Sequence, residues 1–187
     1  MRRLVTAGLT AIVAAGALAG CGSSKSWEKN CTTGENDVVT CTPEQRPDAR
    51  AVTGDLLDGG TYDVGNDRGK VVVVNFWGSW CNPCRAEADD LEETYQATKA
   101  SNVTFVGVNV RDDRDGATAF ERTHGVTYPS IYDPDGAVAL KFDVTQVTTP
   151  ATLILDRQGR IAAALRRSTK VEELRPLVEK IAAEEAN

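Results

Sequence analysis

Two cysteines separated by two residues, Cys81 and Cys84, have the spacing that suits reversible disulfide chemistry. They follow a run of β-branched and aromatic residues, 71–77, that is typical of a strand buried on both faces. The residues after Cys84 favour a helix, so the pair should lie at a helix N-terminus, where backbone N–H groups and the helix dipole favour a thiolate. Pro83 fits the first turn because an N–H there would have no intrahelical partner. The sequence therefore predicts a dithiol–disulfide redox site.

A zinc site is the main alternative for the pair, because structural zinc sites use the same Cys-x-x-Cys spacing. Such a site needs further Cys or His ligands, but the chain has a single histidine, His124, and its other cysteines lie far upstream. His124 has no Cys or Ser motif near it, and we expect a surface or helix-capping residue. We therefore expect no metal site, and no motif indicates a bound cofactor.

The segment 76–84, FWGSWCNPC, resembles the active site of the thioredoxin superfamily. It is most similar to that of the membrane-attached TlpA/ResA-type proteins, which handle disulfides outside the cytoplasm. The resemblance implies a thiol-disulfide oxidoreductase in which Cys81, the sulfur expected to be more exposed, forms a mixed disulfide that Cys84 resolves. A peroxidase of the peroxiredoxin type is disfavoured because its Pro-x-x-x-Thr-x-x-Cys setting is missing.

A second matching element is the dipeptide Thr149-Pro150 at the entrance of an apolar strand. The thioredoxin superfamily has a cis-proline in this position, facing the redox pair, so the resemblance implies a cis bond here. A merely structural proline at a strand start is the alternative. If Pro150 is this cis-proline, the surface that binds the substrate protein would be lined by Trp80, Thr149 and Pro150.

Glu87 lies three residues after Cys84, on the same face of the predicted helix. A carboxylate beside two thiols could accept or deliver a proton during exchange, and ResA-type proteins have an acidic residue in this position. The alternative is a solvated helix charge near the positive end of the helix dipole. Asn75 departs from ordinary thioredoxin, which has a buried acid at the matching strand position, so a proton would have to pass through Glu87 or water.

The start of the chain has the layout of a secretory signal, with basic residues followed by an apolar stretch over 4–19. The stretch 18–21, LAGC, resembles the bacterial lipobox, which implies lipid modification of Cys21 and cleavage after residue 20. An ordinary signal peptide with an incidental cysteine is the alternative. We expect residues 1–20 to be a lipoprotein signal peptide and the protein to be extracytoplasmic, anchored to the cell membrane by lipid.

Residues 21–48 are expected to be a tether that contains a disulfide between Cys31 and Cys41, because nearby cysteines usually pair in an oxidising compartment. Closing so short a loop contributes about 2–3 kcal/mol in the chain-entropy model. We interpret this disulfide as a structural clip. A second redox pair that relays electrons is the alternative, although neither a tryptophan nor a helix signal accompanies it.

Residues 49–187 are expected to form one thioredoxin-like domain of the α/β class, with a mixed central sheet flanked by helices and a β-hairpin extension at its N-terminal end. The hairpin is predicted from 51–57 and 61–64. Helices are predicted from the redox pair to about residue 100, over 117–124 and over 171–185, with a short helical piece over 137–142. Strands are predicted over 103–110, 128–132, 151–155 and 160–165.

The chain is acidic, with a formal net charge of −6 and a sequence pI near 4.9. It has no basic stripe, which argues against nucleic acid as a partner. Its expected partners are client proteins with a Cys-x-x-Cys or a disulfide, a membrane thiol-disulfide electron carrier, and the membrane itself through the lipid anchor.

The direction of electron transfer stays open. ResA-type relatives reduce the haem-attachment cysteines of apocytochromes c, whereas other exported relatives oxidise nascent proteins. We expect a reductase that supports cytochrome c maturation, with an oxidase of exported protein thiols as the alternative. A different class of protein, a non-catalytic binding lipoprotein on a thioredoxin fold, is disfavoured by the intact WCNPC motif of residues 80–84.

Overall fold

The computed structural model describes residues 27–49 and 52–184, so the predicted signal peptide and Cys21 lie outside the described residues. Its strands are β1 (Thr32–Thr33), β2 (Val39–Thr40), β3 (Thr53–Asp55), β4 (Thr61–Asp63), β5 (Val71–Trp77), β6 (Val103–Val110), β7 (Ser130–Asp133), β8 (Ala151–Leu155) and β9 (Ile161–Leu165). Its α-helices are α1 (Asn82–Thr98), α2 (Arg114–His124), α3 (Ala137–Leu140) and α4 (Val171–Ala182). Within the described part of the chain, no helix combines the length and the apolar character that crossing a bilayer requires.

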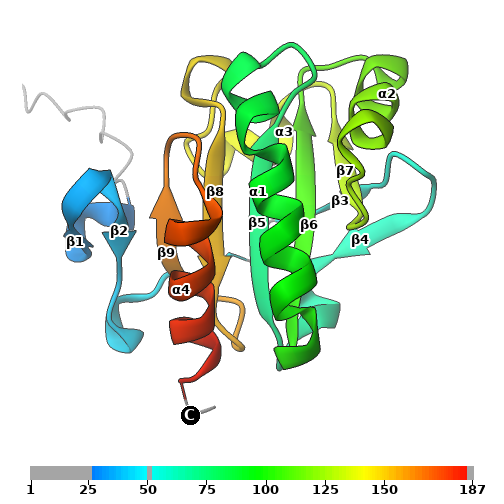
Figure 1. The fold of residues 1–187 in the computed structure, drawn as a ribbon. Helices are drawn as coiled ribbons and strands as arrows, with labels where there is room; N and C mark the ends of the chain where they lie inside the picture. Colours follow the sequence, from blue (N-terminus) through cyan, green and yellow to red (C-terminus); the bar gives the residue numbers. More distant parts are fainter. Residues whose placement is uncertain (1–26, 50–51, 185–187) are drawn as a thin grey trace, which may run out of the picture.

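Seven of the strands form one mixed sheet in the order β1-β2-β9-β8-β5-β6-β7 (Figure 1). At its centre β5 runs parallel to β6 and antiparallel to β8, and all seven residues of β5 are buried. The parallel partner β6 in turn pairs with β7 in the same direction. The α/β class and the mixed central sheet are therefore confirmed.

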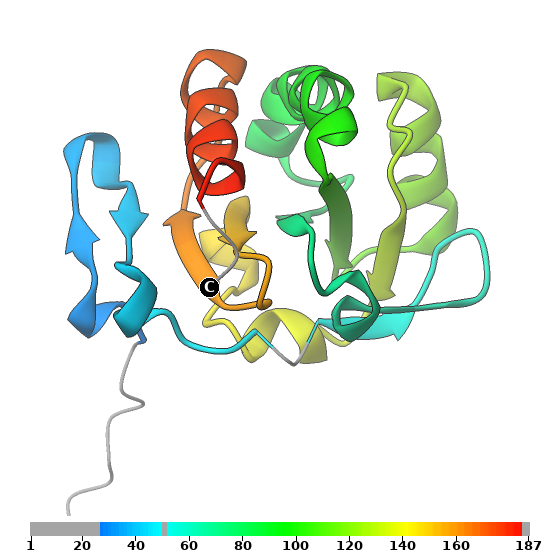
Figure 2. The ribbon, with the colours of Figure 1, turned by 90° about the horizontal axis from the view of Figure 1, so that it is seen from below.

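Alternate residues of β5 supply two cores on opposite faces of the sheet. Val72, Val74 and Phe76 belong to a cluster that includes α3 and the segment leading into the hairpin. Val71 and Val73 belong to a cluster with α1 and α4. Seen from below, α1, α2 and α4 lie on one side of the sheet, whereas α3 lies on the other (Figure 2). The strand therefore places its next odd-numbered residues beneath α1.

The predicted hairpin is present as a separate two-stranded sheet of β3 and β4, with Gly54 opposite Tyr62. Helix α2 begins at Arg114, three residues earlier than predicted. The reason is an N-cap: the Asp113 carboxylate accepts a hydrogen bond of 2.7 Å from the backbone N–H of Gly116. The other predicted elements are observed with ends that differ by a few residues.

The segment expected to be a tether differs from the prediction in its described part. Strand β2 pairs with the edge of β9, so that β1 and β2 extend the main sheet. The predicted disulfide between Cys31 and Cys41 is present, and the backbone N–H of Cys41 donates to the Ala162 carbonyl at 2.9 Å. The described part of this segment thus belongs to the folded domain: Trp27 packs against the core, and β2 covers an edge that β9 would otherwise expose.

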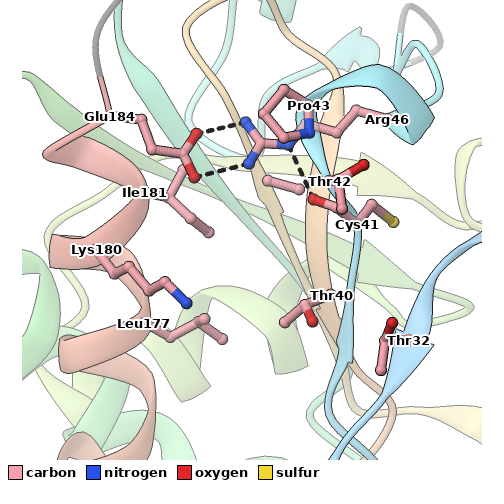
Figure 3. A pocket seen from close by; sticks show the side chains of 11 residues that line it. Thr32, Thr40, Cys41, Thr42, Pro43, Arg46, Leu177, Lys180, Ile181 and Glu184 are labelled. Carbon is pink, nitrogen blue, oxygen red and sulfur yellow. Dashed lines mark hydrogen bonds and ion pairs between the residues drawn. The ribbon is translucent and has the colours of Figure 1, made fainter.

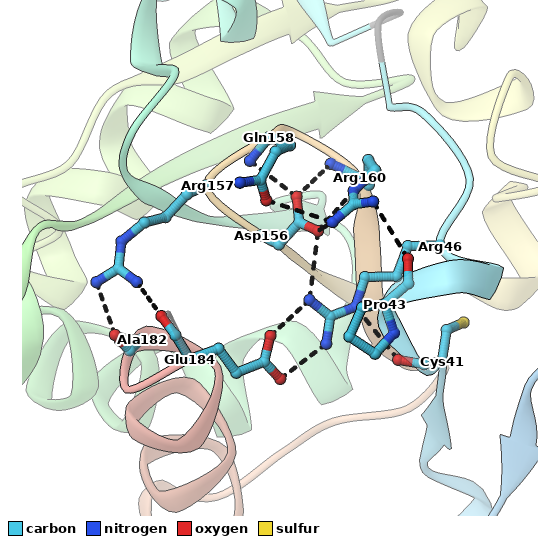
Figure 4. A network of polar contacts seen from close by, with 9 residues as sticks. All are labelled: Cys41, Pro43, Arg46, Asp156, Arg157, Gln158, Arg160, Ala182 and Glu184. Atoms are coloured by element: carbon cyan, nitrogen blue, oxygen red, sulfur yellow. Dashed lines mark hydrogen bonds and ion pairs between the residues drawn. The ribbon is translucent and has the colours of Figure 1, made fainter. Parts of the chain in front are cut away.

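A buried cation holds this segment to the rest of the domain (Figure 4). The guanidinium of Arg46 donates two hydrogen bonds to Glu184, of 2.6 and 2.8 Å, and lies 3.3 Å from Asp156. The side chains of Arg46 and Asp156 are each 5% exposed. Arg157 also donates to the Ala182 carbonyl at 2.7 Å. These contacts join the N-terminal segment, the β8–β9 turn and the end of α4.

Candidate active site

The redox pair lies where β5 gives way to α1, as the sequence predicts. Cys81 is the N-cap residue of α1, Pro83 stands in the first turn, and a disulfide joins Cys81 to Cys84. The two cysteines are 3% and 1% exposed, respectively. Cys81 is thus the more exposed of the two, but only marginally, because Trp77, Phe120 and their neighbours pack around both sulfurs.

The start of α1 supplies electrostatic stabilisation to the first sulfur. The backbone N–H of Cys84 donates to Cys81 Sγ at 3.2 Å, in the position of a side-chain N-cap. The helix is 17 residues long, so the positive end of a full macrodipole lies at this sulfur. Both effects favour a negative charge on Cys81, which is the charge that a nucleophilic thiolate carries.

The loop before the pair is fixed from the end of β6. The carboxylate of Asp112 accepts hydrogen bonds from the Ser79 backbone N–H at 2.5 Å and from Ser79 Oγ at 2.8 Å. The indole Nε1–H of Trp80 donates to the Val110 carbonyl at 3.1 Å. The Trp80 ring lies directly over Gly78, where a Cβ atom would be 2.5 Å from it, so only glycine leaves room for the ring. Asp112 is a site residue that the sequence reasoning missed.

The turn before β8 lies against the redox pair. The peptide bond between Thr149 and Pro150 is cis, as the resemblance implies, and the Thr149 carbonyl oxygen is 3.9 Å from Cys81 Sγ. The Thr149 hydroxyl donates to the Thr145 carbonyl at 2.7 Å, which fixes the approach to the proline. Thr149 and Trp80 are half-buried and Pro150 is buried. The structure therefore brings the Thr149 carbonyl beside the first sulfur of the pair, Cys81 Sγ, with Pro150 next in the chain.

Glu87 is fully buried, at 0% exposure, so the alternative of a solvated helix charge is wrong. Its carboxylate accepts one hydrogen bond from Asn75 Nδ2 and one from the Thr169 backbone N–H, both of 2.9 Å. Asn75 also donates to Thr152 Oγ1 at 3.1 Å. Burial raises the pKa of Glu87 to about 7, and the two hydrogen bonds to the carboxylate offset only part of this effect.

A small cavity of about 10 Å³ adjoins this buried acid network. Its lining includes Asn75, which bonds to Glu87, as well as Cys84 and Tyr128. Burial, reinforced by the negative charge of Glu87, raises the pKa of Tyr128 well above its usual range, so its hydroxyl stays protonated. A cavity of this size is at the lower limit for one water molecule, and the polar residues that line it are Asn75 and Tyr128.

The single histidine lies at the edge of this region. His124 Nδ1 is 3.2 Å from the Asp89 carboxylate, and its ring packs on Phe120. It therefore occupies a helix end, as predicted, and its polar and ring contacts are with Asp89 and Phe120 rather than with the cysteines. Over residues 27–49 and 52–184, no three His, Cys, Asp or Glu side chains converge closely enough to hold a metal ion.

The second disulfide lies at the other end of the sheet. Phe76, at the redox end of β5, pairs with Ala151, whereas Cys41 bonds to Ala162 beside the far end of β8. The four residue steps along β8 alone span about 13 Å, and three strand spacings, from β5 across β8 and β9 to β2, separate the pairs sideways. Direct exchange between the two disulfides would thus require a large movement, which favours the structural clip over the electron relay.

A groove of about 240 Å³ lies beside this second disulfide, between α4 and the β1–β2 hairpin (Figure 3). Its walls carry the apolar side chains of Leu177 and Ile181 and the amine of Lys180, and the Arg46–Glu184 ion pair closes one end. The groove lies away from Cys81 and contains no group that could take part in the exchange reaction apart from the already paired Cys41. We assign it no role in the chemistry.

Comparison with known proteins agrees with this geometry. The family model described as "AhpC/TSA family" matches residues 44–164. The chain is 31% identical over 104 residues to "Thiol-disulfide oxidoreductase ResA" of Bacillus subtilis, covering 56% of this chain and 57% of that protein. It is 37% identical over 120 residues to "Thiol:disulfide interchange protein DsbE homolog" of Paracoccus denitrificans, covering 62% and 63%.

A solved structure supports the same assignment. A secreted thiol-disulfide isomerase from Corynebacterium glutamicum superposes with a TM-score of 0.72 and 33% identity. The match covers 79% of this chain and 92% of the other. The thioredoxin-like fold expected from the motif is therefore confirmed.

Proposed function

Since the chain belongs to the AhpC/TSA family and its relatives are named thiol-disulfide oxidoreductases, we propose that it exchanges disulfides with client proteins through Cys81 and Cys84. The expected class of enzyme agrees with those names. The observation that carries the proposal is the Cys81–Cys84 disulfide at the N-terminus of α1, with the Thr149 carbonyl 3.9 Å from the first sulfur.

In the reducing direction, the Cys81 thiolate attacks one sulfur of a client disulfide and releases the other as a thiolate. Cys84 then attacks Cys81 in this mixed disulfide, so that the Cys81–Cys84 bond forms and the second client thiolate leaves. Two electrons pass to the client, and the two client thiolates take up protons. The oxidising direction is the same sequence in reverse. The hydrogen bond from the Cys84 N–H and the helix dipole assist by stabilising the Cys81 thiolate.

Glu87 is the proposed acceptor of the proton that Cys84 loses before it attacks. A group whose pKa is about 7 is partly ionised at neutral pH and can take up or return a proton readily. Glu87 accepts hydrogen bonds from Asn75 and Thr169, so a proton from Cys84 would cross the small cavity that Asn75 and Cys84 line. One water in that cavity would complete the path.

Trapping the client is the most direct test. With Cys84 replaced by Ser, the mixed disulfide on Cys81 cannot be resolved, so client proteins should accumulate as covalent adducts that dithiothreitol releases. The control is the variant in which Cys81 and Cys84 are both Ser, which should trap nothing. Adducts formed equally by both variants, or by neither under conditions where the wild type exchanges disulfides, would contradict the assigned roles.

The finer proposal is a reductase that supports cytochrome c maturation and draws electrons from a membrane thiol-disulfide carrier. Its support is the resemblance to ResA-type proteins. An apocytochrome c adduct in the trap would favour it, and a midpoint potential as high as that of strong disulfide donors would favour the oxidase instead. A protein whose disulfide dithiothreitol cannot reduce would be the non-catalytic binding lipoprotein.

We also propose that the domain works outside the cytoplasm on a lipid anchor at Cys21. The support is the lipobox resemblance and the similarity to a protein described as secreted. Cys21→Ser should move the protein from the membrane fraction to the medium, with Cys31→Ser as the control for loss of a cysteine. A Cys21→Ser protein that still sediments with membranes would contradict the anchor.

A further inference from the structure

One large apolar side chain stands almost free in solvent. Among residues 27–49 and 52–184, the exposed large hydrophobic residues are Val147, at 93%, and Leu140, at 52%. Every other large aliphatic side chain in this part of the chain is buried or half-buried. Isolated exposed apolar residues are common on proteins, so the exposure of Val147 acquires meaning only from its position and rigidity.

The turn that presents Val147 is held firmly. Val147 is the middle residue of a 3-10 turn, Gln146–Thr148. The hydroxyl of Thr148 accepts a hydrogen bond of 2.7 Å from the Thr145 backbone N–H, and the Thr148 N–H donates to the Thr145 carbonyl at 3.1 Å. A capping box thus fixes both ends of the turn. The side chain of Val147 is therefore displayed by an ordered turn rather than by a frayed loop.

The turn leads directly to the redox pair. Val147 is two residues before Thr149, so the two Cα atoms are at most about 7.6 Å apart. The Thr149 carbonyl in turn lies 3.9 Å from Cys81 Sγ. A client chain joined to Cys81 advances about 3.3 Å per residue when extended. A client residue two to four positions from the reacting cysteine can therefore reach Val147.

We propose that Val147 is a specificity-determining contact that favours clients with an apolar side chain two to four residues from the reactive cysteine. This inference rests on the proposed exchange with client proteins and adds the sequence that they present. An aliphatic side chain that covers Val147 removes apolar surface from water on both partners, whereas a polar side chain gains nothing there. The Thr148 hydroxyl is already bonded to the backbone N–H and carbonyl of Thr145, and the Thr145 hydroxyl lies 3.1 Å from it, so neither hydroxyl offers a polar client residue much.

The test uses three matched pairs of disulfide-linked peptides. The two peptides of a pair differ in one residue, Leu or Ser, which lies two, three or four positions from the cysteine. The reduced wild-type protein should reduce the best Leu peptide with a kcat/KM about three- to tenfold higher than that of its Ser counterpart, mainly through KM. In Val147→Ser this preference should disappear. Leu140→Ser, which changes the other exposed hydrophobic residue, should keep it.

A small aromatic disulfide, too short to reach the turn, provides the reference rate for each variant. A Leu preference that survives in Val147→Ser, or that Leu140→Ser also abolishes, would overturn the inference. So would an equal loss of rate on the peptides and on the small disulfide, or a change in self-association of Val147→Ser on sedimentation, which would assign the side chain to a second copy of the chain. A wild-type protein that reduces neither peptide nor small disulfide would overturn the proposed function itself.

Discussion

Replacing Glu87 by Gln removes a buried acid while keeping its shape, and it should change how the stability of the protein depends on pH. The carboxyl group is 0% exposed, and burial raises its pKa from 4.5 to about 7. The oxygen of the Gln amide can still accept the hydrogen bond from the Thr169 N–H. The Asn75 amide can rotate so that its oxygen accepts a hydrogen bond from the Gln amide nitrogen. The fold should therefore persist.

The sign and size of the effect follow from proton linkage. A carboxyl group with a raised pKa binds its proton more tightly in the folded chain, so its contribution to stability is complete below about pH 4.5 and is lost as the pH rises to about 7. A tenfold change in proton affinity is worth about 1.4 kcal/mol, which gives a loss of about 3 kcal/mol across that interval. The Gln variant has no such loss, because it has no proton to release.

The assay is denaturant unfolding of the oxidised wild-type and Glu87→Gln proteins at several pH values from 4 to 8. As the pH rises from 4 to 8, the free energy of unfolding of the wild type should fall by about 3 kcal/mol relative to that of Glu87→Gln. Glu93→Gln, on the exposed face of the same helix, controls for the loss of one charge. If the two proteins differ in free energy of unfolding by the same amount at every pH, the raised pKa of Glu87 is refuted and, with it, the proposed proton transfer.

Three further predictions concern stability. Arg46→Ala should lower the free energy of unfolding by about 2–3 kcal/mol, because it removes a buried guanidinium that bonds to both Glu184 and Asp156, although Asp156 keeps its pair with Arg160. Arg175→Ala, which breaks an exposed pair, should lower it by less than about 1 kcal/mol; equal losses on urea titration would contradict the packing of the N-terminal segment. Replacing Cys31 and Cys41 together by Ala should lower the free energy of unfolding by about 2–3 kcal/mol, and disulfide exchange at Cys81 should persist. Loss of exchange in a folded variant would instead support the interpretation of Cys31 and Cys41 as an electron relay. Gly107→Ala should lower stability by about 1–3 kcal/mol, since its Cβ would lie 2.2 Å from a serine hydroxyl, and an unchanged melting temperature would show that the neighbours move aside.

The local part of the active site could be predicted from sequence because short-range rules determine it. The β-branched run before Trp77 could only be a buried strand, and a proline in the first helical turn placed the start of α1. The cis bond at Pro150 followed from resemblance alone. Nothing in the spacing of the residues would have indicated it.

The environment of Glu87 could not be predicted in this way. Its burial depends on Thr169, which lies 82 positions further along the chain and donates a hydrogen bond from the loop before α4. The pairing of β2 with β9 was missed for a similar reason: each of β1 and β2 has two residues, too few to show an alternating pattern. The contact of Asp112 with Ser79 likewise joins separate loops.

The near-complete burial of both cysteines places a condition on the proposed exchange. At 3% and 1% exposure, Cys81 and Cys84 differ too little for accessibility alone to decide which sulfur a visiting thiolate reaches first. The proposed order of attack therefore depends on the N-cap position of Cys81, where the Cys84 N–H and the helix dipole favour a thiolate. A visiting chain must also displace part of the packing around the pair before either sulfur can react.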